Sequence, residues 1–151
     1  MTLARSSHGT IIAVQQTPGG AFTDIAELGD VTLPGMSRNE FDAIVQNRNI
    51  DDYVLGILRR APVKVPINFL PGNATHDHLT GVQYLLINNT VTGWKFTVPA
   101  VTGGDAGIVW IASGQVQAFD NIQAPADGKL SADLTLRLSG LMSIGGVSIG
   151  A

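Results

Sequence analysis

The sequence predicts a mainly β protein, a two-sheet β-sandwich or partly closed barrel with one flanking α-helix. The first observation is a strict alternation of apolar and polar side chains from residue 130 to 139. Successive side chains of a strand point to opposite faces, so this segment is a strand with one buried and one polar face. A second alternation runs from Ile108 to Ala118, with both of these residues on the apolar face. Pro125 and Asp127-Gly128 lie between the two segments, which therefore form a hairpin or a neighbouring antiparallel pair.

The N-terminal third is predicted to contain an arm, a strand and a long connection. Residues 1–20 are polar except for a short apolar run at residues 11–14, and they read as an arm that ends in a strand. The segment Ser37–Val45 has both capping-box spacing and alternation, and we interpret it as a strand. Residues 46–62 form a connection longer than most loops and too apolar to be disordered, so we expect it to dock on another surface.

The middle of the chain is predicted to contain an edge strand, a helix and a further strand. Residues 63–69 alternate, and Pro66 within them cannot donate to a sheet ladder, which favours an edge position. A helix follows, capped by Thr75 or Asp77 and ending at Asn88-Asn89. Its apolar stripe comprises Leu79, Val82, Leu85 and Leu86. The next alternation, over residues 94–98, gives one more strand.

The composition indicates one domain, residues 1–151, that assembles with other copies. Charged residues make up 14% of the chain, whereas about 25% is usual for a soluble domain. So little charge favours an obligate assembly in which much of the surface is covered. The net charge of −3 argues against tight binding of nucleic acid, and the absence of cysteine excludes disulfides. We expect neither a signal peptide nor a membrane-spanning helix.

No group of residues predicts catalysis, so we expect no catalytic, cofactor-binding or metal site and no enzyme. His76-Asp77-His78 resembles a metal motif, but it has no third ligand nearby and reads better as a polar helix cap. The carboxylates of Asp51-Asp52 would face opposite ways in an extended chain. Ser6-Ser7-His8 lies in the arm, and Arg59-Arg60 with Lys64 is the one basic cluster, which suits a solvated loop or a subunit contact.

The order of several short motifs resembles the major tail tube proteins of long-tailed, siphovirus-type bacteriophages. The motifs are a charged run followed by hydrophobic–Asp–small, an aromatic segment with Gly–hydrophobic, an Asn-Phe-x-Pro strand end, and three closing strands that finish in Ser-Gly. They are found at Arg38–Ala43, Tyr53–Arg59, Asn68–Gly72 with Thr75–Leu79, Trp94–Pro99, Ser113–Val116 and Leu134–Gly140. The likeness covers about residues 25–142 and lies in the order and spacing of the motifs rather than in any single one.

The resemblance implies a structural virion protein with the phage tail tube fold. Six copies would form a ring, and stacked rings would form the tube through which DNA is ejected into the host. A ring of six copies, each with a net charge of −3, would carry −18. This suggests a lumen that repels phosphates, so that DNA passes without specific binding. The implied partners are further copies of the chain, a tape-measure protein, and tail terminator and tip proteins. The implied location is the virion tail, after assembly in the host cytoplasm.

Under this reading, three segments would make contacts between subunits: the arm 1–20, the connection 46–62 and a C-terminal tail, 141–151. The tail alternates apolar residues with glycines, which suits a segment that becomes ordered on docking. We expect the apolar side chains of the connection and the tail to be the anchors, namely Tyr53, Leu55, Ile57, Leu58, Leu141, Met142 and Ile144.

Three other readings stay open at this point. The same architecture serves the tubes of contractile tails, tail-like bacteriocins, gene-transfer particles and type VI secretion. A β-sandwich that binds sugar or protein at a cell surface would need a platform of aromatic residues, and the chain has only nine aromatics. A small hydrolase would need a convergent catalytic set, which the motifs do not supply.

Overall fold

The computed structural model describes residues 9–43, 53–99 and 107–149. These residues form one seven-stranded sheet, a separate two-stranded hairpin and one short helix. The order in the sheet is β2-β1-β6-β7-β8-β5, with β9 added beside β8. The strands are β1 (Ile11–Gln15), β2 (Phe22–Asp24), β3 (Met36–Asp42), β4 (Tyr53–Arg60), β5 (Val63–Asn68), β6 (Thr92–Val98), β7 (Ile108–Gln123), β8 (Ser131–Ile144) and β9 (Val147–Ile149), and the helix is α1 (Val82–Ile87).

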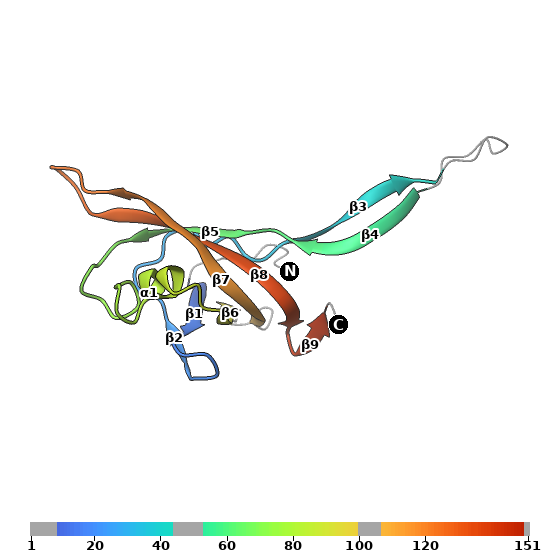
Figure 1. The fold of residues 1–151 in the computed structure, drawn as a ribbon, viewed down its shortest axis with the longest axis horizontal. Helices are drawn as coiled ribbons and strands as arrows, with labels where there is room; N and C mark the ends of the chain where they lie inside the picture. The colour runs from blue at the N-terminus through green and yellow to red at the C-terminus, as the bar shows by residue number, and fades with distance from the viewer. Residues whose placement is uncertain (1–8, 44–52, 100–106, 150–151) are drawn as a thin grey trace, which may run out of the picture.

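The large sheet curls over a single hydrophobic core. In Figure 1, β1, β2, β6 and α1 lie together below the long strands β7 and β8 and the neighbouring β5. The inward side chains of β5, β6 and β8 alternate with outward ones and are fully or almost fully buried, as the alternation predicts. Trp94, Phe96, Leu134 and Leu136 are the largest of them at these strands. The predicted sandwich or partly closed barrel with one flanking helix is therefore confirmed.

The edge strand β5 is partly closed by the segment that follows β2. A single bridge joins Leu28 to Ile67, the Gly29 amide donates to the Pro66 carbonyl at 2.8 Å, and the Asn68 amide donates to the Glu27 carbonyl at 3.0 Å. Pro66 itself has no amide proton, and it lies on the edge strand as predicted. The closure removes part of an edge that would otherwise be open to another strand.

The two C-terminal alternations form the long β7–β8 pair, which confirms the predicted antiparallel hairpin. One detail of the prediction is wrong, because the register shifts between Val116 and Ala118. This β-bulge changes which side chains face inward beyond Val116. Ala118 is therefore only half-buried, and Phe119 enters the core and packs edge-on against Phe69 at 5.1 Å between ring centroids.

The helix is shorter than predicted and begins at Val82 rather than after Thr75 or Asp77. Gly81 is extended, with φ −94° and ψ −160°, which stops a helix from continuing through it. A Cβ at this position would overlap the backbone of His76 and Asp77, so the tight turn requires glycine. Leu79 consequently lies outside the helix and is exposed, whereas Val82 and Leu85 are buried as expected. The helix ends at Asn88, as predicted, and among the described residues no helix is long enough to cross a membrane.

The connection and the tail are both more regular than predicted. Residues 53–60 of the connection form β4, which pairs with β3 in a hairpin that projects from the main sheet (Figure 1). The interpretation of residues 37–42 as a strand is confirmed by β3. Residues 141–144 complete β8 and residues 147–149 form β9 on its edge, so the C-terminal segment is folded rather than a free tail. Residues 11–15 of the predicted arm form β1, between β2 and β6 in the sheet.

Candidate assembly surfaces

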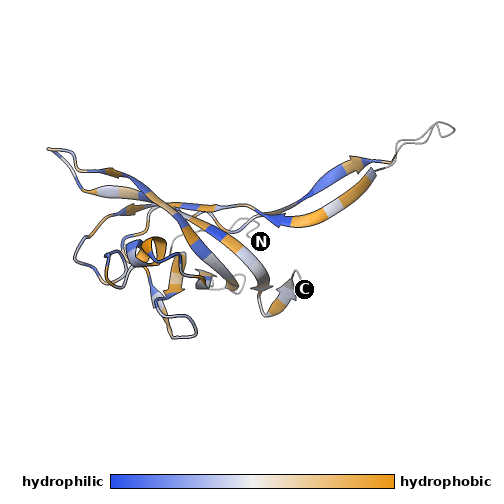
Figure 2. Cartoon of the chain, viewed as in Figure 1, coloured by the Kyte–Doolittle hydropathy of each residue, from blue (hydrophilic) through white to orange (hydrophobic). Residues whose placement is uncertain are grey.

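The β3–β4 hairpin exposes a concentration of large apolar side chains. Ile57 is 76% exposed, Leu55 62% and Tyr53 53%, and Phe41 and Val54 are similarly open. Figure 2 shows this as hydrophobic colour along β4, on a hairpin that pairs with no other strand. Apolar side chains grouped on an exposed element mark an interaction site.

The apolar side chains lie on both faces of the hairpin. Directly paired residues share a face. The register pairs Phe41 with Val54, and pairs Asp42 with the next residue, Tyr53. The two pairs therefore point to opposite faces. Since each face carries an exposed aromatic residue, a single flat contact would leave one of them in water.

A bulge near Gly56 fixes the shape of the hairpin. The register shifts between Arg38 and Glu40, and the Arg38 guanidinium donates to the Gly56 carbonyl at 2.8 Å. A Cβ at Gly56 would lie 2.7 Å from Cε2 of Phe41, so the ring lies over a position that only glycine leaves free. The bulge twists the hairpin and helps to hold Phe41 against it.

The structure separates the seven predicted contact residues into different classes. Tyr53, Leu55 and Ile57 are exposed on β4, and Leu58 is half-buried near its base. Met142, by contrast, is 1% exposed and belongs to the core of its own subunit, so its prediction as a surface anchor is wrong. Ile144 packs against that core in a partly buried position. The side chain of Leu141 lies outside what the structure describes.

A second surface, which sequence reasoning identified only in part, is the polar face of the main sheet. We define the polar sheet face as Lys64 on β5, Asp133, Thr135, Arg137 and Ser139 on β8, and Ser113 and Gln115 on β7. The register pairs Lys64 with Thr135, Arg137 with Gln115, and Ser139 with Ser113, which places these residues on one face. The sequence grouped Lys64 with Arg59-Arg60 instead, because the pairing of β5 with β8 is not visible locally.

The histidine of the metal-like motif has a structural role. His76 is fully buried, its Nδ1 accepts the Leu70 amide proton at 3.1 Å, and its Nε2 donates to the Ala26 carbonyl at 2.7 Å. Since Nδ1 accepts, the ring is neutral and its proton is on Nε2. The neighbouring Thr75 hydroxyl accepts the Ala26 amide proton at 3.3 Å, so these two residues tie the turn to the segment after β2. Nothing here resembles a metal ligand set.

Asp77 organises the turn before α1. Its carboxylate accepts amide protons from Thr80 at 2.8 Å, Gly81 at 2.9 Å and Leu79 at 3.3 Å. These hydrogen bonds, led by the one from Thr80, hold the pKa of Asp77 below its ordinary value. The described residues contain no group of three or more His, Cys, Asp or Glu that could hold a metal ion. Asp51-Asp52 and Ser6-Ser7-His8 lie outside them.

Comparison with known proteins identifies relatives by structure but not by sequence. No protein-family model matches the chain, and no curated protein matches it. The tail of an empty gene transfer agent (GTA) particle with C6 symmetry has a similar chain, with a TM-score of 0.73 and 17% identity over 93% of this chain and 98% of that one. A chain of the six-fold anti-feeding prophage (AFP) baseplate matches with a TM-score of 0.70 and 14% identity over 97% of this chain and 99% of that one.

A bacteriophage tail tube shares the same architecture. The SPP1 tail tube protein matches with a TM-score of 0.64 and 11% identity, covering 91% of this chain and 76% of that one. At such low identity, these likenesses establish the fold and leave the role of the chain to be argued from its surfaces. The chain has the fold found in tail and tube components of phage-like particles.

Proposed function

We propose that this chain is the structural subunit of a tail tube, in which copies form six-fold rings that stack into a hollow tube. The observation that carries the proposal is the match over nearly the whole length of both chains to a tail component with C6 symmetry. A tube role also accounts for the low content of charged residues, because most of the subunit surface would be covered by other copies.

The β3–β4 hairpin is the main contact between subunits in this proposal. Its apolar side chains, Tyr53, Leu55 and Ile57 among them, are exposed in the isolated chain and would be buried against other copies. Apolar groups on both faces suit an element that is inserted between two neighbours. The full connection 46–62, the arm and the C-terminal segment 141–151 stay in the proposal as contact segments, without Met142.

The particle we propose is a long, non-contractile tail that conducts DNA into a host. The motif order that resembles siphovirus-type tube proteins favours this, and so does the fold shared with the SPP1 tail tube. A tape-measure protein and terminator and tip proteins would be its partners, and the virion tail its place after assembly in the host cytoplasm. We propose a structural role and no enzymatic one.

A second candidate is the inner tube of a contractile injection particle. The match to the AFP baseplate favours it, as does a match at a TM-score of 0.68 to a chain in the sheath/tube terminator of an extracellular contractile injection system (PVC). The two candidates differ in whether a sheath surrounds the tube. A sheath-protein gene beside the gene for this chain, or a sheath in native particles, would favour the contractile candidate.

The test of the tube role is negative-stain electron microscopy of the purified protein, concentrated at moderate salt. Hollow tubes or six-fold rings of uniform diameter are the expected result. Dispersed single subunits at every concentration, also after addition of tail tip proteins to nucleate growth, would contradict the proposal and favour a cell-surface binding module.

A further inference from the structure

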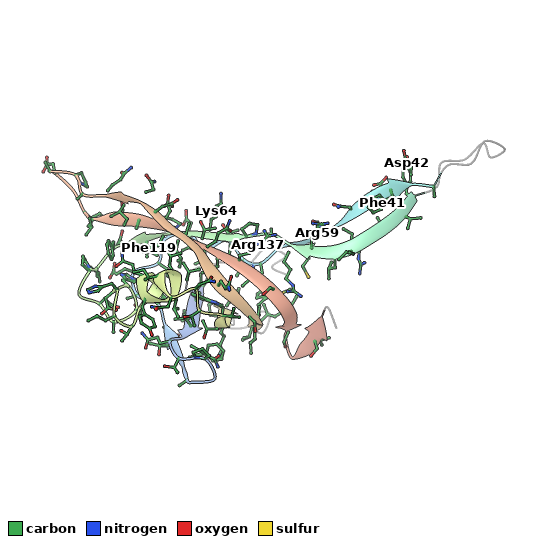
Figure 3. The ribbon with its side chains drawn as sticks, in the orientation of Figure 1. Phe41, Asp42, Arg59, Lys64, Phe119 and Arg137 are labelled. Atoms are coloured by element: carbon green, nitrogen blue, oxygen red, sulfur yellow. The ribbon has the colours of Figure 1, made fainter. Side chains whose placement is uncertain are left out.

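The polar sheet face is the one broad sheet surface that the described fold leaves uncovered. The core, α1, β1 and β6 lie on the other side of β5, β7 and β8 (Figure 1). Figure 3 shows Lys64 pointing away from α1, whereas Phe119 lies on the α1 side. The residues of the face are hydroxyls, an amide, one carboxylate and two cations, with no large apolar side chain among them.

The two cations of this face are available to an outside partner. Lys64 and Arg137 are exposed, and neither forms an ion pair with another described residue. Because Lys64 pairs with Thr135, Arg137 is its diagonal neighbour on the same face, at roughly 7–8 Å between backbones. Asp133 is the other diagonal neighbour of Lys64, and its carboxylate already accepts a proton from the Asn121 amide at 3.0 Å.

The rest of the surface is less suited to line a channel. On the α1 side, Ile87 is 71% and Leu79 66% exposed, and the hairpin is apolar on both faces. Assembly gains free energy by covering such surfaces and leaves the polar one in contact with water. In a ring of six copies, the polar sheet face is therefore the surface that best fits the channel wall.

We infer that the polar sheet face lines the tube channel and that Lys64 and Arg137 contact the phosphates of the nucleic acid inside it. The inference rests on the proposed tube function and changes the expected character of the wall. The net charge of the chain suggests a repulsive lumen, yet this face carries two cations and one carboxylate per subunit. Lysine and arginine beside hydroxyl and amide groups match the contacts that proteins make to a nucleic-acid backbone without reading its bases.

The first part of the test locates the face in assembled tubes. Because the chain has no cysteine, Arg137→Cys and His78→Cys each introduce a single reactive thiol, with His78 exposed near α1 as the matched control. Tubes are treated with a small maleimide or with a maleimide on a polymer too large to enter the channel. We expect the small reagent to label both variants and the large one to label only His78→Cys.

The second part measures retention of a fluorescent single-stranded oligonucleotide by sedimented tubes. For two phosphate contacts, a tenfold rise in salt should lower binding about 25-fold. The Lys64→Gln/Arg137→Gln double variant should lose this salt dependence, while Lys129→Gln, an exposed cation in the β7–β8 turn, should keep it. If the double variant does not assemble, the salt series on wild-type tubes, read with the labelling result, decides.

Three outcomes would overturn the inference. Equal labelling of Arg137→Cys and His78→Cys by the large reagent would place the face outside, although the tube role would stand. Protection of Arg137→Cys with retention that does not depend on salt, or that the double variant preserves, would show that the cations do not hold phosphates. Failure of the wild-type chain to form tubes would remove both the inference and the proposed function.

Discussion

Ile57→Asp on the β3–β4 hairpin should abolish tube formation and leave the subunit folded. Complete burial of an isoleucine side chain contributes about 1.5–3 kcal/mol. Since Ile57 is 76% exposed in the free subunit, its burial on docking contributes at most about 1–2 kcal/mol per contact. A ring of six copies makes six such contacts, so adding one ring would lose about 6–12 kcal/mol. The same change at an exposed strand position should alter the free energy of unfolding by only about 0.5–1 kcal/mol.

Two measurements test this reasoning together. Urea unfolding followed by circular dichroism gives the stability of the subunit, and sedimentation velocity with electron microscopy gives the concentration at which tubes appear. Ile57→Val is the matched control, because it keeps an apolar β-branched side chain and should still assemble. Tubes of Ile57→Asp at the wild-type threshold would refute the assignment of the hairpin as a contact, as would a large loss of subunit stability.

Three further predictions concern the stability of the folded subunit. Leu134→Ala removes a completely buried side chain and should lower the free energy of unfolding by about 2–5 kcal/mol, measured by urea denaturation. Gly114→Ala would place a Cβ 2.6 Å from the Arg137 carbonyl oxygen, and we expect a loss of about 1–3 kcal/mol by the same assay. The lowered pKa of Asp77 stabilises the fold above the ordinary pKa of 3.8, and this is lost as the pH falls through the lower folded value. The melting temperature of Asp77→Asn should therefore fall less than that of the wild type between about pH 5 and about pH 2.5.

The strands of the main sheet were predictable because their signal is local. A sheet with one buried face forces alternation on each strand, and the segments that become β5, β6, β7 and β8 all show it. The alternation also contained the correct position of Met142, which continues the series of inward residues from Leu134. The glycine at position 140, with φ +71°, suggested a flexible tail at a point where the strand in fact continues.

The assembly surfaces were harder to predict, because they depend on pairing between distant segments. Residues 53–60 carry apolar side chains without strict alternation, since the hairpin has apolar groups on both faces and a bulge at its centre. Lys64 and Arg137 are more than seventy residues apart in sequence, and only the register of β5 with β8 makes them neighbours. The helix start was missed for a different reason, the close approach of Gly81 to the backbone behind it.

The isolation of the β3–β4 hairpin has a consequence for the kinetics of growth. Two strands without further partners are at best marginally stable in water, so a free subunit samples this element in many conformations. The first subunits to meet must order their hairpins with few contacts in return, whereas a subunit that joins an existing ring end finds its binding surface already formed. We therefore expect a lag phase that preformed ends abolish, so that tubes grow from a nucleus and subunits stay dispersed until one is present.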